Sequence, residues 1–79
     1  MEQGELEAAA TALARGRLVY RELGLTSSAL RLEADLAAVL LDLGRMPRAE
    51  AMIEDGIATA RRLGDDELAE RFMDLRDGR

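Results

Sequence analysis

The sequence predicts an all-α protein of four helices, paired into antiparallel hairpins that stack on one another. The composition supports this class, because the 79-residue chain has one proline, one tyrosine and one phenylalanine and is rich in alanine and leucine. Single glycines divide the chain into segments whose apolar residues recur at the period of an α-helix. The chain also repeats itself along its length.

The repeat appears when the chain is aligned with itself at an offset of forty residues. Glycine then falls on glycine, alanine on alanine, and a large apolar residue on another. A period of this length is typical of stacked supersecondary units, so we expect a single domain over residues 1–79 that contains two such units. The aligned pairs are Gly4/Gly44, Ala9/Ala49, Leu13/Ile53, Gly16/Gly56, Gly24/Gly64 and Leu32/Phe72.

The first two helices are expected over residues 5–23 and 27–43. Gly24 and Gly44 suit the position after each helix, where a left-handed conformation favours glycine. Thr26 or Ser27 is expected to cap the second helix. The apolar face of the first helix comprises Leu6, Ala9, Leu13, Gly16, Tyr20 and Leu23, and that of the second comprises Ala29, Leu32, Leu36, Val39, Leu40 and Leu43.

The last two helices are expected over residues 47–63 and 66–76. Pro47 fits a first helical turn, where its missing N–H would have no partner. Gly64 ends the third helix, and Asp65 is expected to cap the fourth. The inward residues are Ala49, Ile53, Gly56, Ala60 and Leu63 in the third helix and Leu68, Phe72 and Leu75 in the fourth, with Met46, Met52 and Met73 filling gaps in the core.

Two glycines, Gly16 and Gly56, fall inside predicted helices, where each costs about 1 kcal/mol relative to alanine. They lie on the apolar faces at equivalent positions of the repeat. We therefore expect a neighbouring helix to pass too close for a larger side chain. The alternative is that both glycines are exposed and merely tolerated.

The second and third predicted helices resemble a tetratricopeptide repeat, in which large and small apolar residues and a turn glycine define two antiparallel helices. The matching residues are Leu36, Ala37, Leu40, Gly44, Ala49, Ile53 and Gly56. The aromatic residue that the family places early in its first helix is replaced here by Leu32 or Glu33, and the proline near the end of the unit is absent. The forty-residue period is similar to the longer variant found in regulatory domains of bacterial transcription activators. The resemblance implies a short right-handed solenoid.

The resemblance also implies a non-catalytic module for protein–protein interaction, which binds its partners on the concave surface. On the second helix, the face away from the core carries residues that are candidates to contact a peptide or a partner helix. The alternative for this face is ordinary solvation, with one i,i+4 ion pair. A second function is also considered, that of an oligomerisation or sensor segment in a bacterial transcription or signalling regulator. The candidate residues are Arg31, Asp35, Ala38 and Asp42.

An enzyme is not expected from the side chains available. The chain has no cysteine, no histidine and no lysine, which removes thiol nucleophiles, the commonest general base and the usual zinc sites. Adjacent carboxylates such as Glu54-Asp55 are predicted on helix surfaces, where water keeps them ionised. Neither a calcium loop nor a glycine-rich phosphate loop is present, so no metal or cofactor is expected.

The expected partner is a protein or peptide, because a net charge of −5 opposes general binding to nucleic acid. The chain has no long apolar run and no basic leader, so we expect a cytoplasmic protein without a membrane span. Stacked repeats usually need about three units, and the first helix lacks a preceding partner. Its apolar face beyond Gly16 is therefore expected to be partly open, either because the chain belongs to a longer protein or because it forms a homodimer.

Overall fold

The computed structural model describes residues 3–78, and over this range the all-α prediction with four helices is confirmed. The helices are α1 (Gln3–Glu22), α2 (Thr26–Asp42), α3 (Met46–Leu63) and α4 (Asp66–Arg76). The observed ends of these helices lie within two residues of the expected ones. None of these helices combines the length and the apolar character that crossing a membrane requires.

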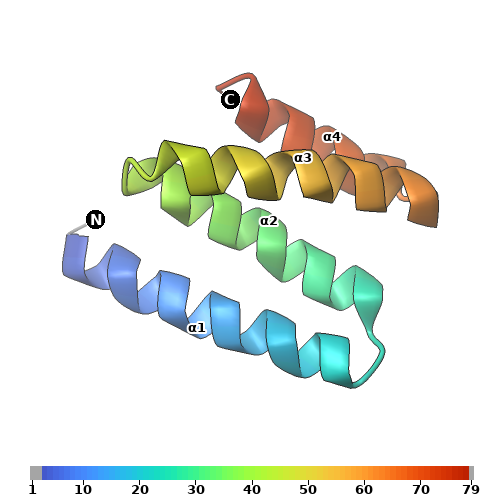
Figure 1. Ribbon diagram of the computed structural model, residues 1–79, viewed down its shortest axis with the longest axis horizontal. Coiled ribbons are helices and arrows are strands. Elements are labelled where there is room, and N and C mark those ends of the chain that lie inside the picture. The colour runs from blue at the N-terminus through green and yellow to red at the C-terminus, as the bar shows by residue number, and fades with distance from the viewer. Residues whose placement is uncertain (1–2, 79) are drawn as a thin grey trace.

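The four helices pack in the order in which they follow one another (Figure 1). The chain reverses direction at each turn, so that α1 packs on α2, α2 on α3, and α3 on α4. Helix α2 also contacts α4, whereas no Cα atom of α1 comes within 8 Å of α3 or α4 in the described part of the chain. The backbone of α1 therefore lies beside α2 only, although its side chains share a small apolar cluster with Ala49 of α3.

The three turns between the helices share one geometry. Each contains a glycine in the left-handed region, with φ of +75° at Gly24, +75° at Gly44 and +72° at Gly64. The N–H of the next residue then bonds back across the end of the preceding helix, as in a Schellman motif. These bonds run from Leu25 to the Tyr20 carbonyl at 2.8 Å, from Arg45 to the Leu40 carbonyl at 2.9 Å, and from Asp65 to the Ala60 carbonyl at 2.9 Å.

This turn corrects the expected cap of the second helix. The residue directly after each glycine is the N-cap, so Leu25 occupies that position in α2 and no side chain caps the helix. Thr26 is already the first residue of α2, and Ser27 follows it. At the equivalent position before α4, the Asp65 carboxylate accepts a hydrogen bond from the Leu68 N–H at 3.1 Å, as expected.

The core is continuous across α2, α3 and α4 and extends to α1 through a smaller cluster. Phe72 of α4 is fully buried between α2 and α3. The smaller cluster joins Ala10 of α1 to Leu36 and Leu40 of α2. The residues that carry the resemblance within the helices are all buried, namely Leu36, Ala37, Leu40, Ala49, Ile53 and Gly56.

Both mid-helix glycines lie where another helix passes closely. A β-carbon added at Gly56 would overlap the ring of Phe72, and one added at Gly16 would lie 2.9 Å from the Cδ1 atom of Leu32. The two contacts are equivalent under the forty-residue offset, which carries Gly16 and Leu32 onto Gly56 and Phe72. The same close approach is thus made twice, by α1 on α2 and by α3 on α4.

Two expected core positions, both at the ends of α3, are exposed. Leu63, at the end of α3, is 45% exposed, and Met46, at its start, is 44% exposed. In the middle of α3, Ile57 is buried although it was not assigned to the inward face. This helix packs between α2 and α4, so its buried stripe is wider than a contact with one neighbour would require.

Candidate functional site

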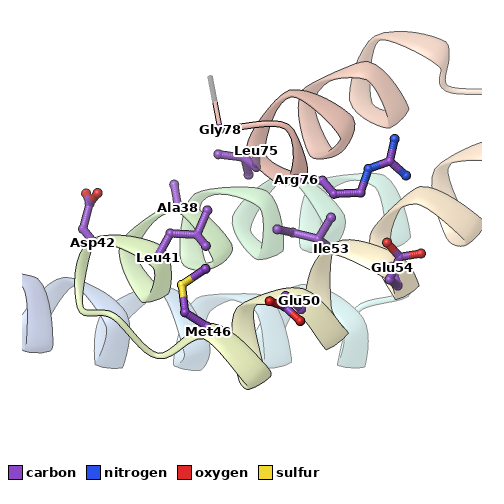
Figure 2. A pocket seen from close by; sticks show the side chains of 10 residues that line it. All are labelled: Ala38, Leu41, Asp42, Met46, Glu50, Ile53, Glu54, Leu75, Arg76 and Gly78. Carbon is purple, nitrogen blue, oxygen red and sulfur yellow. The ribbon is translucent and has the colours of Figure 1, made fainter.

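A groove of about 730 Å³ lies beside the end of α4. Helices α2 and α3 and the C-terminal end of α4 all contribute to it (Figure 2). Figure 2 shows Leu41 and Met46 directed into the space between α2 and α3, with Leu75 across from them. Its lining residues are Ala38, Leu41, Asp42, Met46, Glu50, Ile53, Glu54, Leu75, Arg76 and Gly78.

The groove combines an apolar floor with an acidic rim. Its floor is formed by Ala38, Leu41, Met46, Ile53 and Leu75. The exposed carboxylates on the rim belong to Asp42 of α2 and to Glu50 and Glu54 of α3, and no ion pair of residues 3–78 involves them. The rim also carries Arg76, which pairs at 3.4 Å with the neighbouring Asp77. An apolar side chain flanked by cations would match this surface.

The structure divides the predicted binding face of α2 between two hollows. Ala38 and Asp42 line the groove, whereas Arg31 borders a separate hollow of about 360 Å³ next to α4. Between them, Asp35 forms an ion pair with Arg71 of α4. Helix α4 therefore packs across the predicted binding face of α2. Of the four candidate residues on that face, only Ala38 and Asp42 lie together in the groove.

A buried carboxylate in α2 forms a cluster that the sequence analysis missed. Glu33 is only 6% exposed. Its Oε1 atom accepts hydrogen bonds from Arg17 at 2.8 Å and from Arg21, both on α1. The Nε atom of Arg17 is buried and has no hydrogen-bond partner within the described chain. The i,i+4 spacing of the two arginines was the available signal, because it places both guanidinium groups on one side of α1.

The C-terminal half of α1 exposes a set of apolar side chains, as expected from its missing neighbour. Leu23 is the most exposed of them, at 66%. No Cα atom of α3 or α4 lies within 8 Å of α1 in the described part of the chain. The exposed residues are Leu18, Val19 and Tyr20 of α1 together with Leu23 and Leu25 of the connection that follows it. We call this set the α1 apolar face.

Neither a cluster of metal ligands nor a similar known protein identifies the function of this site. Among residues 3–78, no group of three or more acidic side chains is placed so that it could hold a metal ion. The chain matches no protein-family model, no curated protein and no solved structure. The groove and the α1 apolar face are the two surfaces at which this protein could bind a partner.

Proposed function

We propose that this protein is a non-catalytic interaction module of the tetratricopeptide-repeat type, which binds a peptide or partner helix in the groove beside α4. The observation that carries the proposal is the groove itself, an open apolar hollow in which Ala38 and Asp42 lie together. Buried apolar contacts supply the affinity in such complexes, and charged rim groups add selectivity.

The order of packing supports the repeat assignment. Helices α1 and α3 are equivalent under the forty-residue offset, as are α2 and α4, and the glycine contacts between them recur. In the repeat assignment, α2 and α4 are each the first helix of a unit. Direct contact between α2 and α4 is expected within a short right-handed solenoid. In such a solenoid these two helices line the binding surface.

A selection from a displayed library of random peptides tests the binding proposal. We expect peptides that bind the wild-type protein and fail to bind Ala38→Arg, because the arginine fills the apolar floor. The Arg31→Ala variant is the matched control, since Arg31 lies outside the groove. Enrichment of no peptide, or equal binding to Ala38→Arg, would contradict the proposal, provided that circular dichroism shows the variant to be folded.

The α1 apolar face favours a second function, self-association, as in an oligomerisation segment of a regulatory protein. Contiguous exposed apolar residues commonly mark interfaces. We expect light scattering to give a mass above that of the monomer at high protein concentration. The double variant Val19→Glu, Leu23→Glu is expected to remain monomeric, because it places charges four residues apart on that face. A monomeric wild-type protein at millimolar concentration would rule this function out.

A further inference from the structure

The groove lies beside the C-terminal end of α4, which can be compared with its counterpart in the repeat. Helix α2 has 17 residues and α4 has 11. The forty-residue offset places Leu36 of α2 on Arg76, the last residue of α4. Helix α2 continues for another turn and a half beyond that point, whereas α4 ends and Gly78 turns with φ of +83°. The groove begins at this end of α4.

The first half of the molecule shows what fills the equivalent space. There the end of α2 contributes to an apolar cluster that also contains residues of α1 and α3. The cluster includes Leu36, Val39 and Leu40 of α2, Leu43 directly after α2, Ala10, Leu13 and Ala14 of α1, and Ala49 and Met52 of α3. Positions 36, 40 and 43 follow the i, i+4, i+7 spacing of one helix face. In the second half, residues from the start of α3 line the groove at this place.

At the equivalent positions, α1 carries alanines whereas α3 carries glutamates. On α1, Ala10 and Ala14 contribute to the cluster with Leu36 and Leu40. The offset carries them onto Glu50 and Glu54, which are both exposed at the groove rim. An apolar helix seated there would bury two carboxylates without partners, which is strongly unfavourable. The occupant must therefore bring cations.

We propose that the groove binds about two turns of a basic amphipathic helix from a partner protein, whose apolar side chains pack on Leu41, Met46 and Ile53 and whose arginine or lysine side chains pair with Glu50 and Glu54. This proposal rests on the proposed function and specifies its ligand. The binding mode is a helix seated in a groove. The carboxylate of Asp42 at the α2 side of the rim adds a third partner for basic residues and selects against acidic helices.

Three synthetic helical peptides test the proposal. Each is about 16 residues long, so that it can form a helix in isolation, and carries leucines at the spacing of Leu36, Leu40 and Leu43. The residues flanking the leucines are all arginine, all glutamine or all glutamate. We expect the arginine peptide to bind at least roughly ten-fold more tightly than the glutamate peptide at low salt, with a smaller difference at high salt.

Two double variants locate the effect. Glu50→Gln, Glu54→Gln is expected to remove the advantage of the arginine peptide over the glutamine peptide. Glu67→Gln, Glu70→Gln makes the same change in charge on exposed positions of α4 outside the groove, and is expected to keep that advantage. An advantage that survives in the first variant would overturn the proposal, because the cations would then be recognised elsewhere.

The remaining outcomes separate this inference from the proposed function. If all three peptides bind equally and Ala38→Arg prevents binding, the groove binds helices but does not select basic ones, and only this inference fails. If none of the three peptides binds, this inference fails, whereas the proposed function is decided separately by the selection from the random-peptide library. If the protein alone is dimeric by light scattering and Ala38→Arg makes it monomeric, a second copy of the chain fills the groove, and the basic partner is again ruled out.

Discussion

Glu33 is a charged residue that contributes to a helix–helix contact instead of to the surface. Its carboxylate lies under two guanidinium groups of α1 and is nearly inaccessible to water. The partner Arg17 has a side chain that is 23% exposed, whereas that of Arg21 is 56% exposed. The pair with Arg17 is therefore the better shielded from solvent, and we expect it to be the stronger of the two.

Replacing Glu33 tests this contact. We expect Glu33→Ala to lower the free energy of unfolding by about 1–3 kcal/mol, since it leaves two cations facing a cavity without their acceptor. Urea denaturation measures the change, with Glu70→Ala on the exposed side of α4 as the control. A double-mutant cycle with Arg17→Ala isolates the pairwise energy. If Glu33→Ala were as neutral as the control, the contact would contribute nothing to stability.

The two mid-helix glycines differ in what an added methyl group would meet. The ring of Phe72 is rigid and buried, so we expect Gly56→Ala to destabilise the protein by about 1 kcal/mol or more, even though alanine favours helix. At Gly16 the neighbouring atom is the end of the half-buried Leu32 side chain, which can rotate. We expect Gly16→Ala to change stability by less than about 0.5 kcal/mol or to increase it. Thermal unfolding of both variants is the measurement, and equal effects would contradict this difference.

At the scale of the helices, the turn after each glycine decides where the next helix begins. Because the N-cap is the residue that directly follows the glycine, the cap depends on which side chain occurs there. Asp65 supplies a carboxylate, whereas Leu25 and Arg45 form no side-chain cap. The expected cap at Thr26 or Ser27 was wrong for this reason. Cap preference favours these residues, but the turn geometry places them inside α2.

The difference between the caps predicts different effects of two similar substitutions. Asp65→Ala is expected to lower the free energy of unfolding by about 1 kcal/mol, because it leaves the Leu68 N–H without its acceptor. Thr26→Ala removes no cap and is expected to be neutral or slightly stabilising. Chemical denaturation of both variants checks this prediction, and a larger loss for Thr26→Ala would show that Thr26 has a role in capping after all.

The helices could be predicted from the sequence more fully than their contacts. Glycines at regular spacing and apolar periodicity fixed the positions of four helices. Burial of Glu33 could not be predicted, because a pattern of apolar residues treats a glutamate as a surface residue and its partners lie on another helix. The groove was missed for a related reason. Glu54 was predicted on a solvated helix surface, and the position of α4 beside it could not be deduced from the pattern along α3.

At the scale of the whole molecule, α1 is the least supported helix. Its backbone lies within 8 Å of α2 alone, whereas that of α3 lies beside both α2 and α4. We expect amide hydrogens in the C-terminal half of α1 to exchange about ten-fold or more faster than those in the middle of α3, because a helix with few buried contacts opens locally. Hydrogen-exchange mass spectrometry measures the difference. Equal protection in all four helices would indicate that the molecule opens as one cooperative unit.

The shared geometry of the three turns has a consequence for how this chain can change in length. The segment from Gly24 to Leu63 starts and finishes at equivalent points, so a tandem duplication of the corresponding gene segment would join Leu63 to Gly24. That junction reproduces the one that Leu63 already makes with Gly64, and it places Leu32 where Phe72 now contacts α3. Such a duplication adds two helices without requiring a new connection, whereas an insertion of most other lengths rotates a helix face or breaks a turn. Growth in blocks of this one size is the route by which the gene can lengthen while every helix keeps its neighbours.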